Sequence, residues 1–373
     1  MQIPSAPGLF PSQTITAMIN DNLISAASPV TEEQIQPASL DLRLGDIAYR
    51  VQASFLPGKG SPVRTLLDEL TMHKIDLSQG TVLERGCVYI VPLQEHLRLP
   101  PTVSAITNPK SSTGRLDVFS RLITDGATEF DTVEAGYAGP LYLEIAPCTF
   151  SILARTGDRL NQIRFSQQRS IISDDQLALL HAETPVVSGG ISENFIDKGV
   201  RFTIDLAGGR SRIIGFRARP HTPVIDLRNI SHYQPEDFWE PVTAGSKRGI
   251  ILNPGDFYIL ATQESVSVPP HLAAEMLAYD TLLGEFRVHY AGFFDPGFGW
   301  AAAGGRGSKG VLEVRSHDVP FLLEHGQPTG RLVFEHLTAT PEMVYGTSIS
   351  SNYQSQGLKL GKQFRDWPLT GSV

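Results

Sequence analysis

The sequence is poor in cysteine and has no excess of positive charge. Only Cys87 and Cys148 occur among 373 residues, too few for a disulfide framework or a cysteine-rich zinc site, so we expect both thiols to be reduced. Lys and Arg total 31 against 39 Asp and Glu, a net charge of −8. Bulk electrostatic binding to a nucleic acid polymer is therefore not expected, and an anionic ligand would need a local cluster of cations.

Long apolar runs are also missing. No stretch approaches the ~20 apolar residues of a membrane-spanning helix. The beginning of the chain, "MQIPSAPGLFPSQ", lacks the basic and apolar regions of a signal peptide. We therefore expect a cytoplasmic protein with no membrane partner.

Short β-type segments are abundant, and turn residues separate them. Segments such as "CVYIVPL", "PLYLEI", "FYILAT" and "RLVFEHL" recur between turns in a chain with 34 Gly and 26 Pro. This spacing is typical of sandwiches and barrels, and it predicts an all-β fold with few helices. Helices are expected only near 12–24, where Ser12 would cap the first turn, and over 174–183.

A long internal repeat is the most informative feature of the sequence. Residues 82–101 match residues 251–270 without a gap at an offset of 169, with eight of the twenty positions identical. The same offset pairs Leu143-Glu144 with Leu312-Glu313. We infer a tandem duplication, with one β unit over 1–190 and a second over 191–373.

The segment "NPKSSTGRLD", residues 108–117, combines hydroxyl and cationic side chains. An ordinary surface loop is one interpretation, since Ser, Gly, Pro and Asn are common turn residues. The other is a phosphate-binding loop made by Lys110, Ser111, Ser112 and Arg115, because charge-assisted donors bind phosphate oxygens strongly. The spacing is not that of a P-loop. The second copy has "YDTLLGEF" at the corresponding place, without this combination.

One short pattern imitates a zinc-dependent deaminase. His181–Glu183 reads H-x-E, as in zinc nucleobase deaminases, but the only Pro-Cys, at Pro147-Cys148, precedes it and lacks a second cysteine. Zinc-dependent deamination is therefore not expected, and we predict no metal-ligating residues.

Four motifs in order resemble those of the dCTP deaminases, a family with the trimeric dUTPase-like fold. The motifs are "QPASLDLRLG" at 36–45, "PKSSTGRL" at 109–116, "AGFFDPGFG" at 291–299 followed by "GVLEV", and "NYQSQG" at 352–357. The resemblance covers nearly the whole chain, twice. It implies two tandem distorted β-barrel or jelly-roll units that bind a deoxynucleoside triphosphate.

The resemblance also assigns roles to single residues. A glutamate after leucine would be the catalytic acid and base, with Ser111 and Arg115 beside the reacting base. The residues implied in substrate binding are Lys110, Ser112, Gly114, Asp295, Tyr345, Tyr353 and Gln356. Two departures stand out, because the arginine usual in the hairpin is Phe293 and the lysine usual in the tail is Asn352.

Either Glu144 or Glu313 could supply that glutamate. In the family the serine motif comes from one unit, and the hairpin, glutamate and tail come from another. Here the first copy keeps the serine motif and the second keeps the rest. We therefore expect one composite site between the copies, with Glu313 catalytic and Glu144 as the alternative.

The resemblance implies a zinc-independent deaminase that converts dCTP to dUTP and ammonia, with Mg²⁺ bound only to the nucleotide. A dUTP diphosphatase, or a bifunctional enzyme that also releases diphosphate, is the main alternative, since the fold binds the same triphosphate. A non-catalytic nucleotide-binding protein is a third, disfavoured by the retained Ser111, Arg115 and Leu-Glu pair. A homo-oligomer is compatible with all three.

Overall fold

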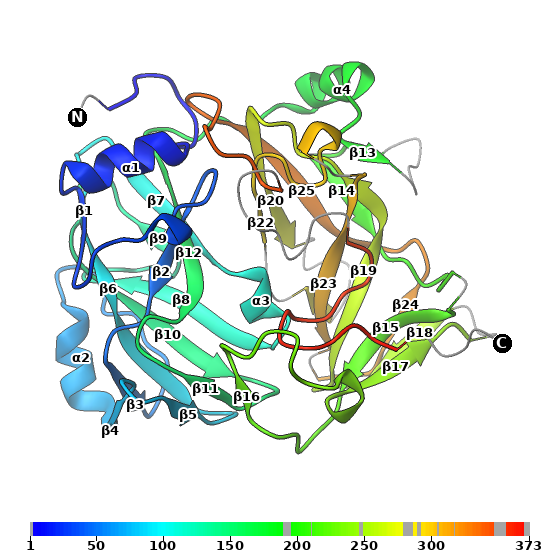
Figure 1. Ribbon diagram of the computed structural model, residues 1–373, viewed down its shortest axis with the longest axis horizontal. Helices are drawn as coiled ribbons and strands as arrows, with labels where there is room; N and C mark the ends of the chain where they lie inside the picture. The colour runs from blue at the N-terminus through cyan, green and yellow to red at the C-terminus, as the bar shows by residue number, and fades with distance from the viewer. Residues whose placement is uncertain are drawn as a thin grey trace.

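Two β units lie side by side in the protein, and the end of the chain crosses between them (Figure 1). The computed structural model describes residues 3–188, 195–209, 211–245, 249–278, 286–288, 292–303, 306–316, 318–346 and 356–368. Strands make up 43% of the chain and helices 12%, which confirms the predicted all-β class. None of the helices in these ranges is long and apolar enough to cross a membrane.

The first unit contains three sheets. Its largest sheet has the order β4-β3-β6-β10-β8, with β1 also on β6; a second has the order β2-β12-β7-β9, and β5 pairs with β11 in the third. The strands are β1 (Ile24–Ala26), β2 (Leu40–Arg43), β3 (Ile47–Val51), β4 (Thr71–Asp76), β5 (Thr81–Leu83), β6 (Val88–Arg98), β7 (Ser104–Pro109), β8 (Val118–Thr124), β9 (Thr132–Val133), β10 (Ala138–Pro147), β11 (Ile152–Ala154) and β12 (Arg159–Ser166).

The second unit repeats this arrangement. Its sheets have the orders β17-β15-β19-β23-β21, with β13 on β19, then β14-β25-β20-β22, and β18-β24. The strands are β13 (Val187–Ser188), β14 (Val200–Thr203), β15 (Ile213–Ala218), β16 (Ile225–Asp226), β17 (Trp239–Thr243), β18 (Gly249–Leu252), β19 (Phe257–Val266), β20 (Leu272–Ala278), β21 (Phe286–Val288), β22 (Phe293–Phe294), β23 (Ser308–Ser316), β24 (Phe321–Glu324) and β25 (Pro328–His336).

The sequence repeat and the sheet register agree closely. Glu144 on β10 lies opposite Ile90 on β6, and Glu313 on β23 lies opposite Ile259 on β19, so the offset of 169 applies to both partners. Equal sheet orders and equal register in the two halves are what a duplicated chain predicts. The two glutamates therefore occupy equivalent places in their units.

Each unit has its own apolar core, but the cores are not divided at one point of the chain. Ile172, Leu177 and Val187 pack in the second core. All three residues precede residue 190, the predicted boundary between the units. That boundary stays a prediction. In the other direction, β16 pairs in parallel with β11 of the first unit, and Phe238 packs in the first core.

Helices are few, as predicted, and one predicted cap is wrong. The helices are α1 (Ser12–Asn20), α2 (Val63–Leu70), α3 (Ser111–Gly114) and α4 (Asp174–Glu183), with 3-10 turns at Glu32–Gln34, Pro235–Asp237 and Ala301–Ala303. Ser173 caps α4 through Gln176, which confirms that helix. Ser12, in contrast, is the first helical residue and is buried, and the cap position belongs to Pro11, whose fixed φ suits a helix start.

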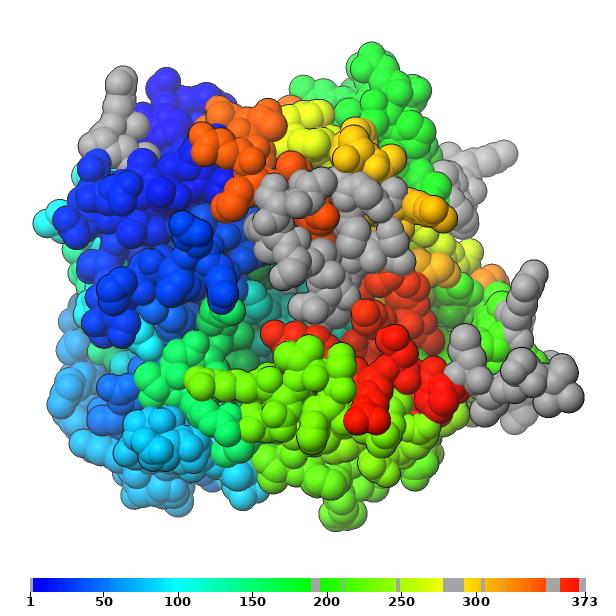
Figure 2. Space-filling view, viewed as in Figure 1, coloured from blue at the N-terminus to red at the C-terminus, as the bar shows by residue number. Residues whose placement is uncertain are grey.

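The C-terminal segment, residues 356–368, is fixed between the units and lies at the surface on the face shown in Figure 2. Phe364 packs in an aromatic cluster with Phe150 of the first unit and with Phe238 and Trp239 of the second. The His232 backbone N–H donates to the Gln363 carbonyl, and the Arg365 backbone N–H donates to the Tyr233 carbonyl. These bonds attach the C-terminal segment to the segment before β17. Gln356 and Lys362, which line a cavity between the units, are thereby held at a defined place.

Candidate active site

A cleft of about 610 Å³ lies between the two units. This volume is in the range of small-molecule sites, which commonly form where two domains meet. Residues of both units and of the C-terminal segment line it, and eight of them were predicted from the sequence: Lys110, Ser111, Ser112, Arg115, Asp295, Glu313, Tyr345 and Gln356. The structure therefore brings the serine motif of the first copy and the acidic residues of the second copy into one cavity.

The serine motif forms a tight turn rather than an extended loop. The Lys110 backbone N–H donates to the Leu160 carbonyl at 2.9 Å, and the buried Thr113 hydroxyl donates to the same oxygen at 2.7 Å. The single-turn helix α3 follows at once and places Ser111 and Ser112 on the cleft wall. Gly114 lies in this turn and is buried but does not line the cleft.

Arg115 reaches from the end of this turn to the C-terminal segment. Its guanidinium donates to the Gln356 side-chain oxygen at 2.9 Å and to the Lys359 carbonyl at 3.0 Å. Gln356 in turn donates to the carbonyl of Lys309 on β23 at 3.1 Å. One arginine of the first unit is thus connected through Gln356 to the strand that carries Glu313.

Glu313 faces the cleft because β23 alternates. Val311 and Glu313 line the cavity, whereas Leu312 and Val314 between and beyond them are buried in the second core. Glu313 is only 4% exposed. Burial raises its pKa from 4.5 to about 8, and the nearby Arg115 charge opposes part of this shift. A carboxyl group with this pKa can both accept and donate a proton near neutral pH.

Asp295 is held by an arginine that sequence reasoning did not identify. Arg164 on β12 crosses from the first unit, and its guanidinium donates to Asp295 Oδ1 at 3.0 Å and to the Phe294 carbonyl at 3.1 Å. The same group lies 4.0 Å from the centre of the Phe293 ring. Burial raises the pKa of Asp295, and Arg164 opposes that shift. The one available signal was an arginine inside the strand pattern "RLNQIRFS".

The turn after Asp295 brings Tyr345 to the cleft. Gly297 has a φ of +93°, and a Cβ there would lie 2.8 Å from Val344 and 2.9 Å from the Tyr345 carbonyl, so glycine is required. The Tyr345 backbone N–H donates to Pro296 at 2.9 Å, and its ring lies against Phe298. Tyr353, also predicted, lies outside the described residues.

Glu144, the alternative catalytic residue, does not line the cleft. Its carboxylate accepts from Arg121 at 2.6 Å and 3.0 Å, and the Arg121 guanidinium lies over the rings of Phe119 and Phe130. Helix α2 packs beside this place through a small apolar cluster. The repeat did not predict this helix, because the corresponding segment of the second copy, between β15 and β17, contains β16 instead. Glu144 is therefore engaged in a structural ion pair.

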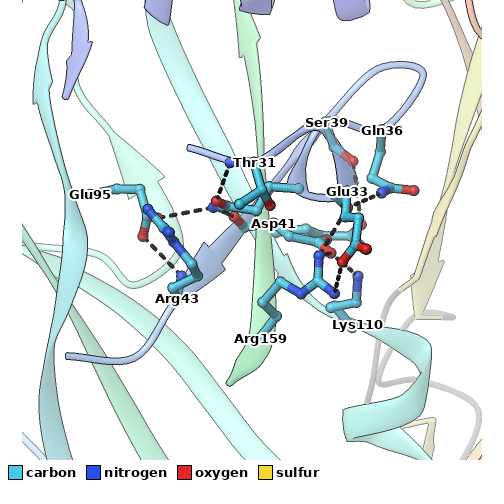
Figure 3. Close-up of polar contacts among 11 residues, drawn as sticks. Thr31, Glu33, Gln36, Ser39, Asp41, Arg43, Glu95, Lys110 and Arg159 are labelled. Atoms are coloured by element: carbon cyan, nitrogen blue, oxygen red, sulfur yellow. Dashed lines mark hydrogen bonds and ion pairs between the residues drawn. The ribbon is translucent and has the colours of Figure 1, made fainter. Parts of the chain in front are cut away.

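Five more charged residues line the cleft: Asp41, which belongs to the motif at 36–45, and Glu32, Glu33, Arg159 and Lys362, which the motifs did not indicate. Lys110 pairs with Asp41, and Arg159 Nη1 lies 3.7 Å from the same carboxylate (Figure 3). Lys362 comes from the C-terminal segment. The cleft thus contains a cluster of cations in a chain whose net charge is negative.

The cleft shared by the two matching β units combines cations, hydroxyl groups and a buried carboxyl group. These are the features of an enzyme that acts on an anionic small molecule. Comparison with known proteins defines it further. The model of the 2'-deoxycytidine 5'-triphosphate deaminase N-terminal domain matches residues 6–169, and that of the C-terminal domain matches residues 173–364. The chain belongs to the dCTP deaminase family and is an enzyme of that family.

Similar proteins carry related names. A crystal structure of 2'-deoxycytidine 5'-triphosphate deaminase from Agrobacterium tumefaciens is 52% identical, with a TM-score of 0.87 over 92% of this chain and 99% of that one. A "dCTP deaminase, dUMP-forming" from Streptomyces griseus is 29% identical over 47% of this chain and 97% of its own length. A "dCTP deaminase" from Halorubrum lacusprofundi is 28% identical over 37% of this chain and 66% of its own.

The raised pKa of Glu313 predicts a pH-dependent stability difference. A buried carboxyl group whose folded-state pKa is raised from 4.5 to about 8 stabilises the fold only while protonated, so its contribution is lost as the pH rises through this interval. Glu313→Gln mimics the protonated form. We expect the variant to match the wild type at pH 4 and to exceed its unfolding free energy at pH 8 by on the order of a few kcal/mol.

Urea unfolding across this pH range measures the difference. Glu69→Gln, an exposed substitution on α2, is the matched control and should show no such pH-dependent gain. A Glu313→Gln variant that is equally or less stable than the wild type at pH 8 would contradict the assigned environment.

Proposed function

We propose that this protein deaminates dCTP by hydrolysis at C4 of the cytosine ring. The observation that carries the proposal is the position of Glu313, a nearly fully buried carboxyl group in the same cleft as Arg115 and the Lys110-Ser111-Ser112 turn. A proton-transfer group and an anion-binding turn from opposite units are the two requirements for this substrate.

In the proposed reaction, Glu313 accepts a proton from a water molecule that attacks C4. It then delivers protons toward N3 and the departing amine, so that water and dCTP become dUTP and ammonia. The pKa of about 8 suits both directions of transfer. Arg115 beside the carboxyl group favours its charged form at the moment when Glu313 must act as a base.

The remaining predicted residues would hold the nucleotide. Lys110, Ser111 and Ser112 are proposed to bind phosphates, and Asp295 the sugar. Arg164 supports the role of Asp295, because a carboxylate fixed by a buried guanidinium presents its other oxygen in one direction. Tyr345 and Gln356 would close the cleft from the side of the C-terminal segment.

The product needs a separate test, because several relatives are named dUMP-forming. We propose dUTP as the product, with a bifunctional enzyme that also releases diphosphate as the second candidate, favoured by those names. Ammonia release and diphosphate release should both be measured, once with dCTP and once with dUTP as the substrate. Ammonia without diphosphate is the result we expect; both products from dCTP would indicate the bifunctional enzyme, and no ammonia would contradict the proposal.

Glu313→Gln should reduce ammonia release by roughly 10²–10⁴-fold, since an amide cannot transfer protons and general acid–base catalysis is typically of this size. Glu144→Gln is the matched control, because Glu144 occupies the equivalent place in the other unit but lies away from the cleft. It should retain activity to within a few-fold wherever the variant is folded. An inactive Glu144→Gln enzyme with an active Glu313→Gln enzyme would reverse the assignment.

We further propose that the reaction needs no zinc and that Mg²⁺ accompanies the phosphates, because hard cations prefer oxygen ligands. Ammonia release should persist after treatment with a zinc-selective chelator and should respond to added Mg²⁺. Loss of activity on zinc removal, restored by zinc alone, would contradict this. A cytoplasmic location, where deoxynucleotides are made, fits the proposed reaction.

A further inference from the structure

A second cavity, of about 310 Å³, adjoins the active-site cleft. The two share four lining residues: Lys110, Ser112, Arg159 and Lys362. Neither Glu313 nor Asp295 lines the second cavity, so it extends the cleft on the side of the cations, away from the proposed chemistry. A ligand bound at Ser112 therefore lies beside this space.

Positive charge exceeds negative charge where the two cavities meet. Lys110 and Arg159 both approach Asp41, a buried carboxylate, as Figure 3 shows. Lys362 adds a third cation, for which the described residues provide no hydrogen bond or ion pair. Burial lowers its pKa, and the charges of Lys110 and Arg159 lower it further. Glu33 also lies 3.6 Å from Arg159, and Asp158 on the wall of the second cavity pairs with Arg228 at 2.7 Å. Lys362 is thus a cation without an ion-pair partner among the described residues, and an anion that enters the cavity would supply one.

The backbone fixes Lys362 at this place. The preceding residue, Gly361, approaches the Arg115 side chain, and the following residues are held by the Tyr233 and His232 backbone N–H groups, which donate to the Gln363 carbonyl. Phe364 then enters the aromatic cluster between the units. The Lys362 backbone is therefore held at the cavity wall, within reach of a ligand in either cavity.

We propose that the second cavity receives the terminal phosphates of a nucleoside triphosphate, and that Lys362 and Arg159 bind them and so select the triphosphate over the diphosphate. The inference rests on the proposed function for the identity of the nucleotide. A compact ammonium and a forked guanidinium are both suited to phosphate oxygens.

Lys362→Met removes the ammonium and keeps most of the side-chain volume. Arg365→Met is the matched control, since Arg365 lies three residues further on, is exposed and lines neither cavity. Calorimetric titration with inorganic tripolyphosphate and with diphosphate measures binding without requiring the deaminase reaction. The KM and kcat for dCTP complete the comparison, and thermal unfolding without ligand reports on the fold.

We expect Lys362→Met to weaken tripolyphosphate binding roughly 10- to 100-fold, as for a lost charge-assisted hydrogen bond, and diphosphate binding clearly less. The KM for dCTP should rise, with a smaller change in kcat, because the contact is present before and during the reaction. The unliganded variant should unfold at the same or a higher temperature, since a like-charge contact is removed. Arg365→Met should resemble the wild type.

Equal weakening of tripolyphosphate and diphosphate, a lower unfolding temperature with a proportional loss of all binding, or no change at all would each overturn the inference. The phosphate-site inference and the deaminase proposal can fail independently of each other. A wild type that binds tripolyphosphate through Lys362 but releases no ammonia from dCTP would refute the deaminase proposal and leave the phosphate site standing. Ammonia release from dCTP with a KM that Lys362→Met leaves unchanged would refute the phosphate site and leave the deaminase proposal standing.

Discussion

Arginines that cross between the two units hold the site together. Arg115 connects the serine turn to the C-terminal segment, Arg164 holds Asp295, and Arg315 on β23 pairs with Asp117 of the first unit. Breaking a buried ion pair typically costs about 3–5 kcal/mol, because the remaining charge loses its partner in a poorly solvated place. The relative position of Glu313 and the serine turn therefore depends on these contacts between the units.

These arginines exist in one copy only. The residue equivalent to Arg164 in the second copy is Val333, and the residue equivalent to Arg315 in the first copy is Ala146. Duplication supplied two equal sheets, and later divergence made the contact between them one-sided. In the first copy, Arg121 and the aromatic rings around it occupy the neighbourhood of Glu144. The two copies have thus become complementary halves of a single site.

Much of this could be predicted from the sequence, for physical reasons. Register is encoded in the alternation of apolar residues, so the repeat alone predicts the equivalence of Glu144 and Glu313. The complementary losses in the two copies indicated Glu313. Arg164 and Lys362 were not identified, because their roles depend on contacts between segments more than 100 residues apart, and no local pattern distinguishes them from other cations. The misplaced cap at Ser12 was a local error, since Pro11 occupies that position instead.

The central claim is that each chain contains one composite nucleotide site. Calorimetric titration of the Glu313→Gln variant with dCTP tests it directly, since the variant should bind the nucleotide without turning it over. We predict a stoichiometry of one nucleotide per chain, with binding abolished when Arg115→Ala is added in the same chain. Two nucleotides per chain, or binding that survives the loss of Arg115 unchanged, would contradict the account.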